Sequence, residues 1–173
     1  MITALILAAQ IAGAIPSDTP PPSPAQRVRA VEVSDWYGRR LALHRALSYT
    51  VIPLFGFQYA AGTQIWEKGD AAPAWARRGH RIGAATIGGV FVVNTVTGAW
   101  NLWDSRHAEE GRARRYLHAA SMFVADAGFT WAGAKLSEEA ERSIDKRRLH
   151  RTVALSSMAI SVASGLIMYF TND

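Results

Sequence analysis

The sequence predicts an all-α membrane protein, an antiparallel four-helix transmembrane bundle preceded by a signal peptide and a Pro-rich tail. The first observation is four long stretches with almost no charge, of which three contain no Asp, Glu, Lys or Arg and one contains a single Asp: 46–66, 82–103, 152–172 and 116–134. An α-helix of about 20 residues spans a hydrocarbon core of roughly 30 Å. The second observation is that all 19 Lys and Arg residues lie outside these stretches, where membrane flanks carry them.

The N-terminal segment precedes the predicted bundle and has a different composition. Its first residues are apolar but too few to cross a bilayer comfortably, and they end in Ala12-Gly13-Ala14, a pattern that suits signal peptidase. We therefore predict a signal peptide over residues 1–14, with an uncleaved amphipathic or re-entrant segment as the alternative. Residues 15–35 include a polar stretch too rich in proline to form a helix, which predicts a linker or tail.

Residues 36–173 form the predicted transmembrane domain. We expect its helices over 41–64, 80–103, 116–136 and 149–170, with Trp and Tyr residues near their ends at the depth of an aromatic belt. The distribution of Lys and Arg places the first and third loops on the cytoplasmic side. This predicts a multi-pass protein of the plasma (inner) membrane with both termini on the exported side.

The basic character of the chain, with a net charge of +5 and a pI near 10.0, is compatible in principle with a nucleic-acid binder. Its basic residues flank apolar helices instead of clustering as phosphate contacts require, so we expect no nucleic-acid partner. The chain has no cysteine. Disulfides, thiolate metal sites and covalently attached c-type haem are therefore excluded.

Four of the five histidines occupy matching places near the N-terminal ends of the predicted helices: His44, His80, His118 and His150. Consecutive helices run in opposite directions, so His44 and His118 share one side of the membrane and His80 and His150 share the other. A b-type haem in a bundle needs two imidazoles from different helices. We predict two non-covalently bound b haems with these pairs as iron ligands; interfacial polar histidines are the alternative.

Two further sets of residues are predicted to contact the haems. Residues one helical turn after the histidines are mostly small and leave space for a flat macrocycle: Ser48, Ala84, Met122 and Ala154. Arginines beside the histidines can pair with haem propionates, or alternatively extend to lipid phosphates: Arg40, Arg45, Arg81 and Arg151.

Asp126 is the one carboxylate inside a predicted transmembrane helix, where an ionised side chain is costly. We expect Asn94, at a similar depth in the preceding helix, to be its hydrogen-bond partner. Asp126 then either carries protons or contacts a quinone, or it serves only to lock helix packing.

The histidine pattern resembles the four-helix core of the cytochrome b561 family, in which each core helix carries one haem-ligating histidine and alternate helices share a haem. The resemblance covers roughly residues 36–172 and rests on histidine spacing and topology. The chain lacks the two flanking helices of eukaryotic members and has no evident ascorbate-binding signature. The resemblance implies transmembrane electron transfer between two haems, with an oxidoreductase of quinol, ascorbate or ferric reductase type as the corresponding enzyme.

The partners expected from this interpretation are membrane lipid and an electron donor and acceptor, such as quinol or a periplasmic redox protein. The chain then acts as a homodimer or as a subunit of a larger complex. Two other functional classes stay open at this point. One is a non-redox helical subunit that stabilises a larger complex, and the other is a small cation or metal transporter that uses Asp126 and the histidines.

Overall fold

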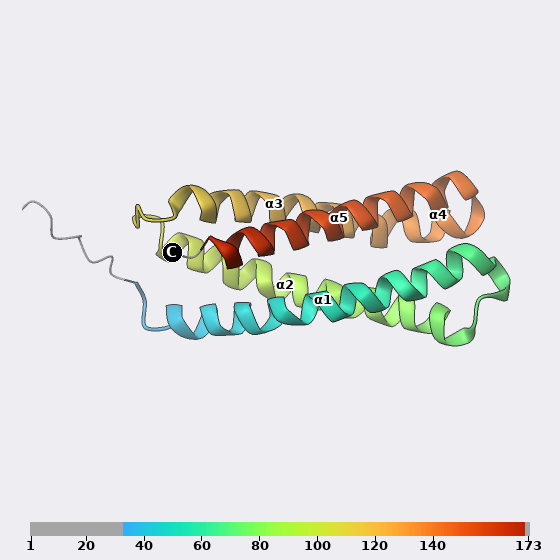
Figure 1. Ribbon diagram of the computed structural model, residues 1–173, viewed down its shortest axis with the longest axis horizontal. Helices are drawn as coiled ribbons and strands as arrows, with labels where there is room; N and C mark the ends of the chain where they lie inside the picture. Colours follow the sequence, from blue (N-terminus) through green and yellow to red (C-terminus); the bar gives the residue numbers. More distant parts are fainter. Residues whose placement is uncertain (1–32, 172–173) are drawn as a thin grey trace, which may run out of the picture. The chain divides into compact units, whose positions relative to one another are not determined.

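The computed structural model describes residues 33–171, and this part of the chain contains helices and no strand (Figure 1). The four long helices are α1 (Tyr37–Lys68), α2 (Ala74–Asp104), α3 (Arg112–Trp131) and α5 (Ile144–Phe170). A π-helical turn (Ala132–Leu136) and a short helix, α4 (Ser137–Arg142), lie between α3 and α5. The all-α prediction is therefore confirmed. The predicted signal peptide (1–14) and most of the predicted linker (15–35) lie outside the described residues.

The helices begin four to six residues earlier than the sequence predicted, at residues 37, 74, 112 and 144. The flanking segments are rich in Arg and Ala, which favour helix, so the charged residues at the edge of each apolar stretch do not end the helix. The histidines consequently lie six or seven residues inside their helices, not at the helix ends where the sequence analysis placed them.

The turns between the helices use glycine where the backbone requires it. Gly69, directly after α1, has a φ of 53°, and Gly111, directly before α3, has a φ of 62°. Residues with a side chain adopt such positive φ values at a cost in free energy. Pro73 precedes α2, because the proline ring suits a position where no helical N–H bond is needed.

The long helices pack as two hairpins, α1 along α2 and α3 along α5, and α2 also contacts α3 (Figure 1). Apolar side chains fill the centre. The buried core consists of Val51 and Phe55 from α1 with Ile87 and Phe91 from α2. The Phe129 ring of α3 lies 5.0 Å from the Phe91 ring, edge to face, a favourable aromatic contact.

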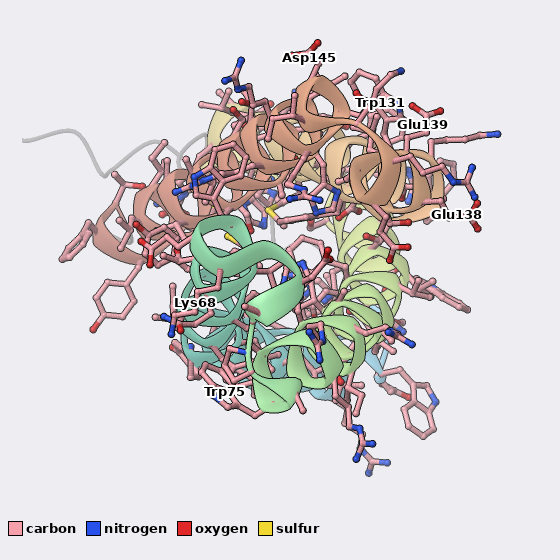
Figure 2. The ribbon with its side chains drawn as sticks, turned by 90° about the vertical axis from the view of Figure 1, so that its right-hand side faces the viewer. Lys68, Trp75, Trp131, Glu138, Glu139 and Asp145 are labelled. Carbon is pink, nitrogen blue, oxygen red and sulfur yellow. The ribbon has the colours of Figure 1, made fainter. Side chains whose placement is uncertain are left out.

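Two of the described helices, α2 and α5, are long and apolar enough to cross a membrane. α1 and α3 do not meet the same criterion of length, hydropathy and low charge. α3 is only 20 residues long and contains arginines in its first turn as well as Asp126. Figure 2 looks onto the end of the molecule that carries α4. Glu138 and Asp145 project outward there, and Trp75 and Trp131 also lie on the outer surface.

α3 and α5 lie close together at Gly128. A Cβ atom at this position would overlap the Ser157 Oγ and would lie 3.4 Å from the Ser157 Cβ. Small residues allow such close contact between helix backbones.

Substitution Gly128→Leu is therefore expected to force α3 and α5 apart and to lower the free energy of unfolding by about 1–3 kcal/mol, the usual cost of overpacking. Thermal unfolding in detergent, followed by circular dichroism, measures this effect. Gly165→Leu on α5 is the matched control, because a Cβ atom there would meet no atom within 4 Å. Equal melting temperatures for the two variants would contradict the expectation.

Candidate functional site

Two pairs of histidine side chains lie face to edge between the two hairpins. The ring centres of His44 on α1 and His118 on α3 are 6.3 Å apart, with an interplanar angle of 82°. The ring centres of His80 on α2 and His150 on α5 are 6.2 Å apart, with an interplanar angle of 64°. The structure thus brings together the same residues that the sequence analysis paired.

The first pair is oriented by hydrogen bonds to its Nδ1 atoms. His44 Nδ1 lies 3.1 Å from the Asn94 carbonyl oxygen and 3.3 Å from Thr97 Oγ1, both on α2. His118 Nδ1 lies 2.8 Å from Ser164 Oγ on α5. The Asn94 carbonyl oxygen can only accept, so His44 Nδ1 carries the hydrogen and His44 Nε2 is available to a metal, while the bond to Ser164 orients the His118 ring.

The second pair is held less symmetrically. His150 Nδ1 lies 3.0 Å from the carbonyl oxygen of Ala132, the first residue of the π-helical turn. A carbonyl acceptor implies an Nδ1–H donor, so Nε2 is again free. His80 Nδ1 is buried and has no hydrogen-bond partner within residues 33–171.

One histidine of each pair packs against a glycine of the neighbouring helix. A Cβ atom at Gly98 on α2 would lie 3.1 Å from His44 Cε1. The equivalent atom at Gly62 on α1 would lie 3.4 Å from His80 Cε1. α1 and α2 therefore make the same kind of contact with each other. On each helix, the backbone at a glycine packs against an imidazole of the other helix.

The spacing within each pair fits two imidazoles bound to opposite sides of one metal ion. A metal–imidazole bond is about 2 Å and the ring centre lies roughly 1 Å further out, which gives about 6 Å between ring centres. The observed separations are 6.3 and 6.2 Å. Haem iron takes four ligands from its porphyrin and needs only two from the protein. The donor set of each pair therefore fits a b-type haem.

A cavity of about 560 Å³ lies beside His80 and His150. This volume is in the range of small-molecule and cofactor sites. Ala84 and Ala154, each one turn after a histidine, line the cavity together with Gly133. Two of the small residues predicted to leave space for a macrocycle therefore border an actual cavity.

The other two residues of that predicted set have different contacts. Ser48 Oγ donates to the His44 carbonyl oxygen of its own helix at 2.7 Å and accepts from Asn94 Nδ2 at 3.2 Å. Met122 packs against the central apolar core. Ser48 thus joins α1 to α2 beside His44, and Met122 contributes to packing.

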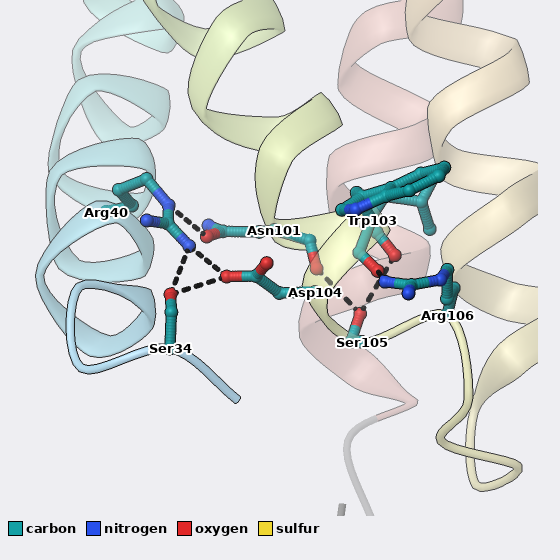
Figure 3. Close-up of polar contacts among 8 residues, drawn as sticks. Ser34, Arg40, Asn101, Trp103, Asp104, Ser105 and Arg106 are labelled. Atoms are coloured by element: carbon teal, nitrogen blue, oxygen red, sulfur yellow. Dashed lines mark hydrogen bonds and ion pairs between the residues drawn. The ribbon is translucent and has the colours of Figure 1, made fainter. Parts of the chain in front are cut away.

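Arg40, predicted as a propionate partner, is engaged within the chain (Figure 3). Its guanidinium pairs with the Asp104 carboxylate and donates to Asn101 Oδ1 at 3.1 Å and to Ser34 Oγ at 3.0 Å. Ser34 Oγ also donates to Asp104 at 2.6 Å. This network ties the start of α1 to the end of α2 at the His44 end of the molecule.

The remaining predicted arginines lie at the surface or near it. The Arg151 guanidinium lies 5.0 Å from the centre of the Trp66 ring, a cation–π contact between α5 and α1. Arg45 and Arg81 are exposed. Each directly follows a histidine, and one helical residue corresponds to about 100° of rotation, so these side chains emerge on a different face from the imidazoles.

Asp126 is bonded to Thr95 and not to Asn94, so that expectation was wrong. Thr95 Oγ1 donates to Asp126 Oδ2 at 2.5 Å, whereas Asn94 Nδ2 donates to Ser48 on α1. The predicted depth of the Asp126 partner along α2 was correct to within one residue. The predicted side chain was wrong because neighbouring residues of α2 face different helices. Asn94 faces α1, and Thr95 faces α3.

Several residues that hold the histidines were not identified from the sequence. Ser164 and Ala132 carry oxygen atoms that hydrogen-bond to histidine rings, and Gly62 and Gly98 pack against rings. Backbone carbonyls give no signal in a sequence, because every residue has one. A glycine inside an apolar helix does give a signal of close approach, but it does not tell which side chain approaches.

Comparisons of the chain with protein-family models, curated proteins and solved structures gave no match.

Proposed function

We propose that this chain is a di-haem b-type membrane cytochrome that transfers electrons across the bilayer. The observation that carries the proposal is the presence of two histidine pairs, each with ring centres just over 6 Å apart, one on α1 and α3 and the other on α2 and α5. Among residues 33–171, no third His, Cys, Asp or Glu joins either pair, whereas a catalytic zinc site uses three protein ligands. Two bis-imidazole sites are what a non-covalent di-haem protein requires.

The spacing between the pairs supports a role across the membrane. Along α1, His44 belongs to one pair and Gly62 contacts His80 of the other. Eighteen helical residues at 1.5 Å each correspond to about 27 Å, close to the thickness of a hydrocarbon core. The two histidine pairs would then hold one haem near each membrane face, with the apolar core around Phe55, Phe91 and Phe129 between the two sites.

All four long helices are proposed to span the membrane as an antiparallel bundle, including the less apolar α1 and α3. Apolar side chains on their outer faces support this: Phe123 on α3 is 73% exposed and Ile52 on α1 is 56% exposed. Large apolar surfaces of this kind indicate contact with a membrane or a partner. The charge distribution favours the plasma (inner) membrane with exported termini and a preceding signal peptide.

The residues of this chain have defined tasks in the proposal. His44, His118, His80 and His150 bind the irons, and bound haem supplies reversible one-electron chemistry. Asn94, Thr97, Ser164 and Ala132 orient the imidazoles through Nδ1 and increase their basicity. The proposal agrees with the resemblance to the cytochrome b561 family and leaves the natural donor and acceptor open.

Electron transfer across a sealed bilayer tests the proposal. Proteoliposomes with trapped ferricyanide and external dithionite should lose the ferricyanide absorbance rapidly when the protein is present. A His80→Ala variant, with only the other haem, should be slower by an order of magnitude or more, because electron tunnelling weakens steeply with distance. The proposal fails if protein-containing and protein-free vesicles react equally fast, provided that dye retention shows both to be sealed.

A further inference from the structure

Gln58 is a buried polar residue on α1, within the charge-free stretch 46–66, and is only 5% exposed. Its Nε2 atom donates to the His80 carbonyl oxygen on α2 at 3.0 Å. Its Oε1 atom is shielded from solvent and has no hydrogen-bond partner within residues 33–171. A buried amide oxygen without a partner is costly. An apolar side chain of the same size would avoid this cost, so packing stability alone does not explain an amide here.

The Gln58 amide packs against α2 at a glycine. A Cβ atom at Gly83 would lie 3.0 Å from Gln58 Oε1 and 3.1 Å from Gln58 Cδ, closer than Cβ atoms usually approach a neighbouring atom. The absence of a side chain at residue 83 therefore leaves the space that the amide occupies. Gly83 lies three residues after His80, on the same face of α2. Gln58 thus contacts the turn of α2 that carries His80.

His80 in turn packs against α1 at Gly62. A Cβ atom at Gly62 would lie 3.4 Å from His80 Cε1 and 3.7 Å from His80 Nδ1. Gly62 lies one helical turn after Gln58, so one face of α1 contacts both the backbone and the ring of His80. The ring has no hydrogen-bond partner at Nδ1 in the described part of the chain. These two contacts with α1 therefore take the place of the Nδ1 hydrogen bonds that orient the other three paired histidines.

The same arrangement, with α1 and α2 exchanged, occurs at His44. Asn94 on α2 carries the corresponding amide, and Gly98 follows it at the interval that separates the amide from the glycine on α1. Asn94 Nδ2 donates to Ser48 Oγ at 3.2 Å, and Ser48 Oγ donates to the His44 carbonyl oxygen at 2.7 Å. The ring of His44 packs against Gly98. The repetition of an amide and a glycine around a histidine of the other helix indicates a common task.

We propose that Gln58 is the positioning residue of His80. Its amide holds the turn of α2 that carries His80 against α1, so that the imidazole points toward His150, with ring centres 6.2 Å apart. All three residues border the same cavity. The inference rests on the proposed function, because it gives Gln58 a task toward a proposed iron ligand. Gln58 itself does not bind the iron and acts only through His80.

Haem dissociation from single-haem variants tests the inference. In a His118→Ala background the expected haem is that of His80 and His150. Adding Gln58→Met should raise its rate of transfer to excess apomyoglobin roughly threefold to tenfold, the effect of losing one hydrogen bond. In a His80→Ala background the expected haem is that of His44 and His118, and Gln58→Met should leave its rate of transfer unchanged.

A haem-free measurement separates this inference from the proposed function. NMR of the full-length chain, with isotope-labelled histidine and purified without haem, reports each imidazole directly. Gln58→Met should shift the His80 resonances and leave those of His44 unchanged, while the melting temperature stays near that of the natural sequence. Gln64→Met is the matched control and should alter neither set, because Gln64 lies on the same helix but on a different face from Gln58.

Unchanged His80 resonances in Gln58→Met would overturn the inference. Haem transfer that is unchanged in the His118→Ala background, or equally accelerated in both backgrounds, would also overturn it. If Gln58→Met does not fold, judged by its helical circular dichroism, Gly83→Ala displaces the Gln58 amide instead and should shift the His80 resonances alone. A natural chain without haem whose His80 resonances respond to Gln58→Met would remove the proposed function and keep this inference. Two bound haems without that response would do the reverse.

Discussion

Replacing His118 with alanine is expected to give a protein that carries one haem per chain instead of two. His118 is the partner of His44, with ring centres 6.3 Å apart, and without the His118 imidazole one side of that iron would have no protein ligand. The His80 and His150 rings, on α2 and α5, form a separate pair and should keep their haem. A pyridine haemochrome assay per mole of protein measures the loss of half the haem.

The matched control for this variant is His107→Ala, which removes the histidine that lies in the turn after α2 and belongs to neither pair. It should retain both haems. Loss of both haems from a folded His118→Ala protein would mean that the two pairs do not form separate sites. Retention of both would mean that His118 is not a ligand.

Gly98→Leu is expected to remove the same haem without altering any histidine. A Cβ atom at residue 98 would lie 3.1 Å from His44 Cε1 and 3.5 Å from His44 Nδ1, so a leucine there must displace the ring. Displacement also breaks the hydrogen bonds from His44 Nδ1 to Asn94 and Thr97. The haem held by His44 and His118 should be lost or bound with altered ligation, visible in the reduced α-band.

Gly89→Leu provides the comparison, because Gly89 lies on the same helix and a Cβ atom there would meet no atom within 4 Å. This variant should have the spectrum and haem content of the natural sequence. Identical spectra for Gly98→Leu and Gly89→Leu would show that His44 does not occupy a constrained position, and the proposed ligation by His44 would have to be abandoned.

The pairing of the histidines was open to prediction because it depends on two coarse features. Stretches without charge reveal where helices lie, and alternation of direction then determines which histidines share a side. Neither feature requires exact helix ends. The helices in fact begin four to six residues earlier than predicted. All four histidines therefore lie further inside their helices by a similar number of residues, and the pairing is unchanged.

The contacts around the histidines were less accessible to prediction because they depend on rotation about each helix axis. Asn94 and Thr95 are adjacent in sequence, yet one bonds to α1 and the other to Asp126 on α3. A change of one residue rotates a side chain by about 100°. Similarly, Arg40 stands near His44 in sequence, but the Asp104 carboxylate at the end of α2 is its partner.

The central claim is that imidazoles of alternate helices hold two b haems in one chain. The most direct test is the visible spectrum and the haem-to-protein ratio of the natural sequence purified from haem-replete cells. The account predicts a red protein with a sharp reduced α-band and two haems b per chain. A colourless protein with native helical circular dichroism would contradict it.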